Sequence, residues 1–437
     1  MRNKFIYIYY FVLILVLALY TNMSHSPNML IRLGYLAALV LPLVQRKELV
    51  PAVFICALGI SANTFAYPFM PTEMFYYVTL ALGFALLSLH RYEYRTDINS
   101  MFVLALLYVF LNDIIMQGKP SQMVSVFLIC ISFYLCMEDE VEFDSQFLSL
   151  AFILISLTIS YWALFCPDAQ INSYNKVEDM EQTGWTDPNY LSVVLGAGLV
   201  VAVKDLLKGD NKLIYLIVLI LTVVGATVAM LQLASRGIIL AVILAVVALF
   251  ALSKTQSWVK IIVVIAAALF VVFLYSNQYM EFVLARFEMD DGTGSHRTEI
   301  WASKFTDFFN KRNPLNWIFG VGQEEGYRLG KYYGLSVTGV STHNDFVSVI
   351  IYYGFVGVAL FFSVIAYPLR ICQKSDRQQI IALLVYPLMC SMTLEPMAHG
   401  NFVYWGFLFY IIILARQSQA LEFVEDEEDE DEDEDQD

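Results

Sequence analysis

The sequence predicts an all-α membrane protein, a polytopic bundle of about 12 to 14 transmembrane helices with a large, partly helical extracytoplasmic loop. The chain has 437 residues and is 58% hydrophobic, with a mean hydropathy of +0.61. This is too apolar for a soluble protein of that length. Apolar runs long enough to cross a bilayer recur along it, and Lys and Arg are distributed unequally among the segments that connect them.

Apolar runs predict about eight spans in the N-terminal half and about six more in the C-terminal half. The first set lies at roughly 5–21, 29–44, 49–66, 74–89, 98–116, 122–137, 146–166 and 189–203. The second set lies at roughly 213–231, 237–253, 258–276, 344–369, 379–395 and 401–415. Several of these runs are short, so the count is open by about two.

The runs and the polar segments between them divide the chain into five parts. These are N-terminal spans 1–184, central spans 185–276, a polar loop 277–342, C-terminal spans 343–416 and an acidic tail 417–437. The formal charge is −15, but 12 acidic residues lie between Glu425 and Asp437, so the remainder is close to neutral. Such a tail cannot bury apolar surface, and we expect it to be disordered.

Positive charge sets the expected orientation, because short cytoplasmic loops retain Lys and Arg. With the N-terminus inside, the short outer loops hold only Arg32, Lys119, Lys176 and Arg236. The cytoplasmic set is Arg2, Lys4, Arg46, Lys47, Arg91, Arg95, Lys204, Lys208, Lys212, Lys254, Lys260, Arg370, Lys374, Arg377 and Arg416. Both termini are therefore predicted inside the cytoplasm, and the loop 277–342 outside it.

The outer loop contains one amphipathic run that begins at Ser295 and stops at Asn313-Pro314. Its apolar residues recur at helical spacing, and Arg297 falls on their side. A helix start beside a guanidinium suits a phosphate group. A lid that only packs over the membrane domain explains the same pattern, and the run alone does not separate the two interpretations.

Arg236 stands between two apolar runs with almost no loop around it, so its guanidinium must lie at the outer rim of the membrane. A charge in that position is costly and is a functional candidate. The alternative is an arginine that reaches out to lipid phosphates.

His343 precedes Asn344 and Asp345 at the start of a span. An imidazole there can exchange a proton near neutral pH, or it can simply face water at a helix start. Asp187-Pro188-Asn189 is a helix-start signal, with Asp as the cap and Pro in the first turn. The spacing of the five histidines matches no metal motif, so we predict neither a metal site nor a cofactor.

As an ordered set, these elements resemble the O-antigen ligase and polymerase superfamily of bacterial membrane enzymes, which transfer glycans from undecaprenyl diphosphate. The resemblance covers roughly residues 185–370. It rests on Asp187-Pro188-Asn189, Ser235-Arg236-Gly237, Arg297-Thr298-Glu299-Ile300-Trp301, Gly320-Val321-Gly322, His343-Asn344 and Gly354-Phe355-Val356-Gly357. It implies that Arg236 and Arg297 hold the lipid diphosphate and that His343 assists the acceptor. Asp187, Asn189 and Asn344 then either contact the acceptor or support the structure.

The resemblance implies a metal-independent, inverting glycosyltransferase in the bacterial inner membrane, with its main loop in the periplasm. The donor is an undecaprenyl diphosphate-linked glycan, and the acceptor is a lipid A core sugar in a ligase or a second lipid-linked glycan in a polymerase. We place ligase first. We expect membrane lipids as neighbours and no nucleic acid. A lipid-linked sugar flippase or transporter, which would carry charges near mid-bilayer, is the alternative from another class.

Overall fold

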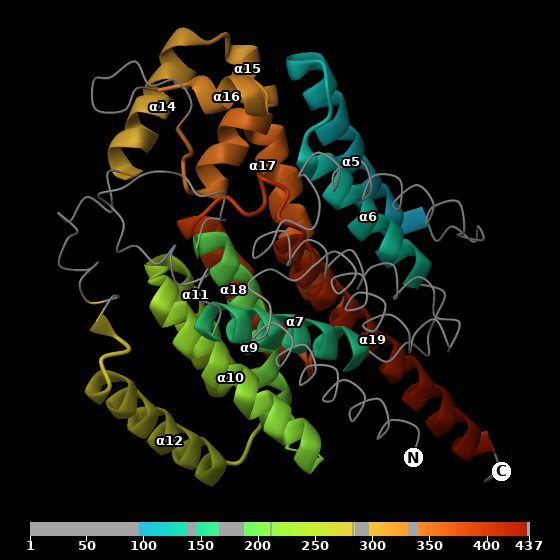
Figure 1. Ribbon diagram of the computed structural model, residues 1–437. Helices are drawn as coiled ribbons and strands as arrows, with labels where there is room; N and C mark the ends of the chain where they lie inside the picture. The colour runs from blue at the N-terminus through green and yellow to red at the C-terminus, as the bar shows by residue number, and fades with distance from the viewer. Residues whose placement is uncertain are drawn as a thin grey trace, which may run out of the picture.

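The computed structural model describes residues 96–137, 146–165, 188–209, 212–281, 284, 297–330 and 340–434. The regular elements in these ranges are all α-helices, which confirms the predicted all-α class (Figure 1). The spans predicted before residue 95 lie outside them, as do Asp187 and the segments 285–296 and 331–339 of the outer loop.

Four helices in the described part of the chain are long and apolar enough to cross a membrane. They are Leu148–Phe165 within α7, and the whole of α9, α10 and α17. Shorter apolar helices occupy Met101–Gln117, Gln122–Tyr134, Arg236–Leu252 and Phe402–Ser418. The predicted runs and the observed helices therefore agree in type and order wherever both are described.

The first described helices are α5 (Thr96–Gln117), α6 (Gln122–Met137) and α7 (Gln146–Phe165). The central helix, α9 (Pro188–Lys208), is buried along almost its whole length, from Leu191 to Asp205. A helix that is apolar on every face has no face that favours water, so it packs inside a bundle. Helices α7, α10 and α11 pack around it.

Helices α10 (Leu213–Leu233) and α11 (Arg236–Leu252) are joined by a turn of two residues. Ala234 takes a left-handed conformation, with φ of 50°, and its amide donates to the carbonyl of Leu231 at 3.1 Å. The turn is so short that Arg236 must stand at the end of the bundle, as the sequence predicts. Helix α12 (Ser257–Ser276) then runs along its edge (Figure 1).

Three short helices cover one end of the bundle: α14 (Arg297–Lys311), α15 (Pro314–Phe319) and α16 (Gln323–Arg328). The predicted amphipathic helix is α14, and its apolar residues Ile300 and Phe308 are buried. Phe308 joins the core of the bundle, so α14 packs as a lid over the membrane domain. Asn313 caps α15 through a 3.0 Å hydrogen bond from the amide of Leu315.

Helix α17 (Asp345–Ile371) is kinked at Gly354, where φ is 63°. The kink frees carbonyls that the lid uses: the amide of Val321 donates to Ile351 O at 2.9 Å, and that of Gly322 donates to Tyr352 O at 3.0 Å. The Gly-Val-Gly segment and the kink of α17 at Gly354, which are distant in sequence, are thus in direct contact.

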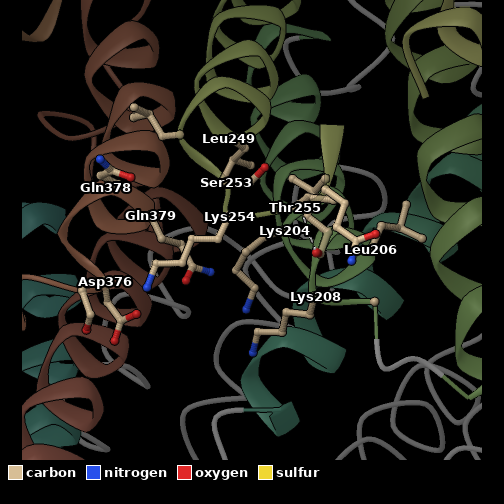
Figure 2. A pocket seen from close by; sticks show the side chains of 15 residues that line it. Lys204, Leu206, Lys208, Leu249, Ser253, Lys254, Thr255, Asp376, Gln378 and Gln379 are labelled. Carbon is tan, nitrogen blue, oxygen red and sulfur yellow. Dashed lines mark hydrogen bonds between the residues drawn. The ribbon is translucent and has the colours of Figure 1, made fainter. Parts of the chain in front are cut away.

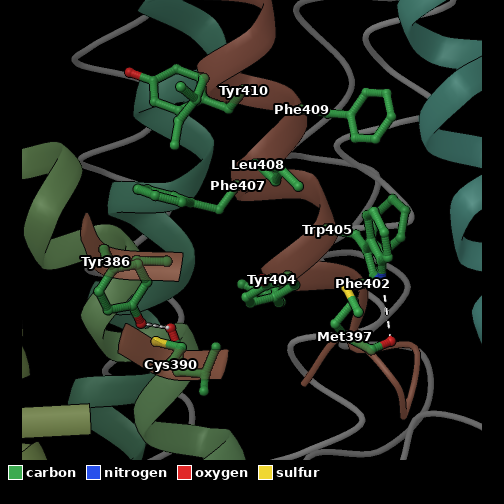
Figure 3. Packing of buried hydrophobic residues seen from close by; sticks show 14 of the residues in the cluster. Tyr386, Cys390, Met397, Phe402, Tyr404, Trp405, Phe407, Leu408, Phe409 and Tyr410 are labelled. Carbon is green, nitrogen blue, oxygen red and sulfur yellow. Dashed lines mark hydrogen bonds between the residues drawn. The ribbon is translucent and has the colours of Figure 1, made fainter. Parts of the chain in front are cut away.

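Helices α18 (Arg377–Thr393) and α19 (Phe402–Glu434) complete the bundle. Aromatic side chains of α19 fill the core on two sides (Figure 3): Trp405 packs on Phe127 of α6 at 4.8 Å between ring centroids, and Phe407 on Tyr386 of α18 at 5.2 Å. The backbone of α19 is helical to Glu434, and the disorder that the sequence predicts from residue 417 stays a prediction.

Candidate functional site

The first helical turns of α9 and α11 meet at one end of the bundle. Ser235, the residue before α11, donates its hydroxyl to Oδ1 of Asn189 at 2.8 Å. A Cβ on Gly237 would lie only 2.6 Å from Cβ of Thr393, the last residue of α18. Glycine therefore allows α11 to start in contact with α18, and Arg236 is half-buried beside this contact.

Arg297 reaches the same residue from the lid. It is the first residue of α14, and its Nη1 donates to the carbonyl of Thr393 at 2.8 Å. Trp301, one turn on, donates from its indole to the carbonyl of Thr342 at 2.7 Å. The starts of α11 and α14 thus converge on Thr393 from two sides, and we call this end of the molecule, with Arg236 and Arg297, the arginine end.

His343 and Asn344 lie at the same end, at the start of α17. His343 is half-buried and has a φ of 50°, an uncommon conformation for a residue other than glycine, in which histidine is enriched. Asn344 is buried and supports the structure: its Oδ1 accepts from the amide of Val347 at 3.1 Å and its Nδ2 donates to Met392 O at 3.0 Å. The cap of α17 therefore fixes the backbone that presents His343.

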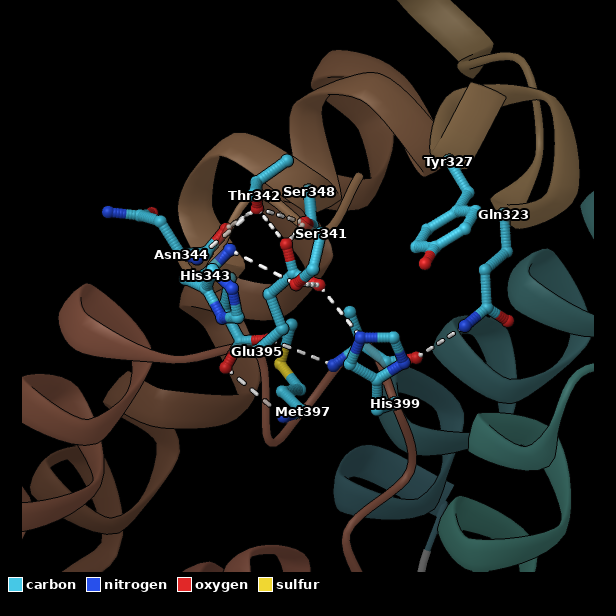
Figure 4. Close-up of polar contacts among 12 residues, drawn as sticks. Gln323, Tyr327, Ser341, Thr342, His343, Asn344, Ser348, Glu395, Met397 and His399 are labelled. Carbon is cyan, nitrogen blue, oxygen red and sulfur yellow. Dashed lines mark hydrogen bonds and ion pairs between the residues drawn. The ribbon is translucent and has the colours of Figure 1, made fainter. Parts of the chain in front are cut away.

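Glu395, in the loop between α18 and α19, is the centre of a polar network (Figure 4). Its side chain is 0% exposed, and it accepts hydrogen bonds from Ser341 at 2.9 Å, from Ser348 at 2.8 Å and from Thr342. Its Oε2 also lies 2.8 Å from Nε2 of His399, whose side chain is 35% exposed. One buried carboxylate therefore links the segment before α17 to a histidine that is open to solvent.

The charge of Glu395 is stabilised by its partners. Burial by itself raises the pKa of this carboxyl, but the hydrogen bond and charge of His399, with the hydroxyls of Thr342 and Ser348, outweigh burial and lower the pKa to about 2. The carboxylate is ionised at neutral pH, and it fixes the orientation of the His399 imidazole.

A second acidic side chain holds the loop that carries Glu395 and His399. Asp345 is buried, and its side chain accepts from the amides of Met397 at 3.1 Å and Ala398 at 2.9 Å, and from the hydroxyl of Ser391 at 2.8 Å. The rings of Tyr190 and His399 meet edge to face at 6.2 Å between centroids. His399 is therefore next to the first turn of α9 and close to Asn189.

Lys304 fastens the lid at this end. Its ammonium donates to the carbonyls of Gly326 at 2.9 Å and Tyr327 at 3.1 Å, and so joins α14 to α16. Burial lowers the pKa of Lys304 to about 8, against the opposing charge of Glu395. A buried lysine that is bonded to two carbonyls is a structural element of the lid.

The fold brings Asn189, Arg236, Arg297, His343 and Asn344 to one end of the molecule, while Asp187 lies outside the described residues. Sequence analysis missed Glu395 and His399 as a site. The available signal was a glutamate at the edge of an apolar run with a histidine four residues later. Among the described residues, no group of three His, Cys, Asp or Glu side chains could hold a metal ion. The adjacent carboxylates Asp290 and Asp291 of the outer loop, a residue pair that could hold a divalent cation, are outside the described residues, so metal independence stays a prediction.

Comparison with known families adds one result. The family model described as O-antigen ligase matches residues 217–362, which run from α10 into α17 and include Arg236, Arg297 and His343. This segment is similar to the O-antigen ligase family. The resemblance predicted from the sequence is thereby confirmed, and Glu395 and His399 lie beyond the matched segment. No curated protein matches the chain.

The O-antigen ligase family, which this segment resembles, implies lipid-linked glycan substrates. The arginine end offers the groups that such a substrate requires. Two guanidiniums at helix starts can bind a phosphate-rich leaving group, and an imidazole oriented by a carboxylate can accept a proton.

Proposed function

We propose that the protein is an O-antigen ligase-like glycan transferase. It moves a saccharide from undecaprenyl diphosphate to an acceptor hydroxyl at the outer face of the bacterial inner membrane. The observation that carries this proposal is the convergence of Arg236 and Arg297, from separate helix starts, beside the pair formed by Glu395 and His399. In this proposal the lipid tail remains in the membrane while its diphosphate reaches the arginine end.

The reaction balances without a cofactor. The acceptor oxygen attacks the anomeric carbon, the bond from that carbon to the diphosphate oxygen breaks, and undecaprenyl diphosphate leaves with the bonding electrons. Attack from the face opposite the leaving group inverts the anomeric centre. Arg236 and Arg297 stabilise the charge that develops on the diphosphate, because planar guanidiniums bind phosphate oxygens through two hydrogen bonds.

The acceptor hydroxyl loses a proton, which an imidazole takes up. His343 is the first candidate, because the cap of α17 fixes its backbone in the matched domain. His399 in its neutral form is a second candidate, and the 2.8 Å contact with Glu395 favours it, since the carboxylate orients the ring and stabilises the imidazolium that forms. A repeat-unit polymerase uses the same site with a second lipid-linked glycan as acceptor, and only the acceptor distinguishes it from a ligase.

Measurements of donor binding and of glycan transfer should distinguish the roles of the arginines from those of the histidines. We expect Arg236→Lys and Arg297→Ala to bind a labelled undecaprenyl diphosphate-linked donor at least tenfold more weakly, because lysine lacks the bidentate fork and alanine lacks the charge. The variant of the histidine that acts as base should bind donor within twofold of wild type and transfer it about a hundredfold more slowly. His343→Ala and His399→Ala are compared directly.

The control is Arg328→Ala, which removes an exposed arginine paired with Glu324 on α16. All variants are normalised to protein in the membrane, and the control should bind and transfer like wild type. Near wild-type transfer by Arg297→Ala or Arg236→Lys would contradict the proposed site. A lipid-linked sugar transporter would then be the better interpretation.

A further inference from the structure

The three helices of the lid differ in the side chains that they expose. Among its described side chains, α14 exposes only small or polar ones, and α16 does so apart from Tyr327. Helix α15 instead exposes large apolar side chains: Leu315 at 60%, Ile318 at 43% and Phe319 at 44%. Their spacing places them on one face of the helix. An exposed apolar face of this kind marks a surface that meets lipid or another protein.

Helix α5 shows at which level of the membrane domain α15 lies. The carbonyl of Phe319 accepts hydrogen bonds from Asn112 and, at 3.2 Å, from the hydroxyl of Tyr108. Between its start at Thr96 and Asn112, α5 rises about 24 Å. The positive-inside distribution predicts that the start of α5 is cytoplasmic, because Arg95 precedes it.

Helix α17, on which α15 packs (Figure 1), gives the same level. A Cβ on Gly354 would lie 2.3 Å from the carbonyl oxygen of Ile318, so the kink of α17 touches α15 directly. From Gly354 to Ile371, α17 rises about 25 Å, and Arg370 marks this end as cytoplasmic. The hydrocarbon core of a bilayer is about 30 Å thick. Both helices therefore place α15 at the outer boundary of that core, where acyl chains meet head groups.

The apolar face of α15 lies beside the apolar surfaces of its two neighbours. On α5, the exposed residues Leu107, Leu111 and Ile115 form one stripe, which reaches past the residue that holds α15, Asn112. Phe355 of α17, next to the kink, is exposed as well. Because α17 is long and apolar enough to cross a membrane, we expect its exposed apolar side chains to contact acyl chains.

The backbone at both ends of α15 is paired with side chains. The amide of Leu315 donates to Oδ1 of Asn313 at 3.0 Å, and α5 supplies the two donors to the carbonyl of Phe319. Near the hydrocarbon core little water is available to bond the free groups at a helix end, so these groups need partners within the protein. The ends of α15 therefore suit a position at the membrane boundary.

We propose that α15 anchors the lid in the outer leaflet of the bilayer, with Leu315, Ile318 and Phe319 against the acyl chains. Helices α14 and α16, whose exposed side chains are mostly polar, stay on the water side. The bilayer is favoured over a second copy of the chain, because three side chains are too few for a stable protein interface. The proposal concerns the placement of the lid and does not depend on glycan transfer.

The test uses the purified full chain in nanodiscs, with a small fluorescent amino acid at one position in each variant. Position 315 is compared with 306, since Thr306 is exposed on α14, and with 115 on the apolar stripe of α5. One quencher is phosphatidylcholine brominated on its acyl chains, and the other is iodide in the water. We expect the brominated lipid to quench the label at 315 about as strongly as at 115 and at least threefold more than at 306. Iodide should give the reverse order.

Two results would overturn the proposal. Quenching by iodide at 315 that equals quenching at 306 would place α15 in water. Quenching at 315 by neither agent would show that protein covers the face, either another part of this chain or a second copy. A label at 318 repeats the measurement on the same face, and melting temperatures identify any labelled variant that does not fold like the wild type.

Discussion

Glu395 shows at the scale of one residue how this protein keeps a charge inside a membrane domain. Ionised carboxylates are rarely buried unless they are paired and hydrogen-bonded. Glu395 has both kinds of partner, in three hydroxyls and one imidazole. These partners come from the segment before α17, from α17 itself and from the loop after α18, so one side chain holds three parts of the arginine end together.

The lowered pKa of Glu395 makes the stability of the protein sensitive to acid. Its folded pKa of about 2 is below the ordinary value of 4.5, so its stabilising contribution is present above about pH 4.5 and is lost as the pH falls toward 2. We expect the melting temperature of the wild type to fall more steeply over that interval than that of Glu395→Gln. At pH 7 the variant should be less stable by about 1–3 kcal/mol, because it loses charge-assisted hydrogen bonds.

Glu324→Gln is the control for this measurement. It removes an exposed carboxylate that pairs with Arg328, and surface pairs contribute little to stability. Thermal melts of both variants and the wild type are recorded from pH 7 to pH 2. Parallel acid profiles for Glu395→Gln and the wild type would show that the network does not stabilise the carboxylate.

At the scale of elements, the contact between the lid and α17 depends on the absence of side chains. A Cβ on Gly320 would lie 2.1 Å from the carbonyl oxygen of Tyr352, and one on Gly354 would lie 2.3 Å from that of Ile318. The hydroxyl of Tyr108 in α5 donates to Tyr353 O at 2.6 Å and to Phe319 O at 3.2 Å, so it closes the same junction from outside. A kinked helix, a short helix and a loop are here joined backbone to backbone.

Two glycine variants should distinguish the energetic cost of a strained backbone conformation from the cost of a steric clash. Gly320 and Gly209 have nearly the same φ, 82° and 81°, but a Cβ on Gly209 would meet nothing within 4 Å. Gly209→Ala should therefore cost only the strain of its left-handed conformation, roughly 1–2 kcal/mol. Gly320→Ala should cost at least about 3 kcal/mol and lower the abundance of folded protein. Melting temperatures that fall equally in both variants would show that the lid does not dock on α17.

Sequence patterns located the helices but not their contacts. The run 237–253 predicted α11 to within one residue at each end, because hydrophobicity directly reports what a bilayer requires. The run 379–395 ended two residues too late, since α18 stops at Thr393. That small error placed Glu395 inside a span and hid its pairing with His399. An apolar run predicts that its own residues are buried. It does not predict which carbonyl a distant arginine will bind.

The same limit applies to the site. Arg236, Arg297 and His343 stand out in the sequence because cations and titratable groups outside the cytoplasmic loops are unusual in such a chain, and their roles stay predictions. The convergence of Arg236 and Arg297 beside Thr393 depends on Gly237 and on the turn at Ala234, which are packing features of the whole fold. The contacts of Lys304 likewise could not be predicted from the sequence, because its two carbonyl partners belong to another helix, α16.

At the scale of the whole molecule, helices α9, α11 and α18 run from the arginine end to a cavity at the other end of the bundle, which residues of the stretches 204–209, 249–256 and 375–379 line (Figure 2). We assign glycan transfer to the arginine end, and we expect the chemistry to need only the chain, the lipid-linked donor and an acceptor. Variants at Arg236 and Arg297 should then alter transfer.

Metal-independent transfer at the arginine end is tested most directly with the purified protein in liposomes. The liposomes contain an undecaprenyl diphosphate-linked glycan and an acceptor, and EDTA is present. The glycosylated acceptor and the released undecaprenyl diphosphate are quantified together. We predict equal amounts of both products from the wild type, unchanged by EDTA, and at least a hundredfold less from Arg297→Ala. Activity that EDTA abolishes and a divalent cation restores would contradict metal-independent transfer, and wild-type activity in Arg297→Ala would contradict the site.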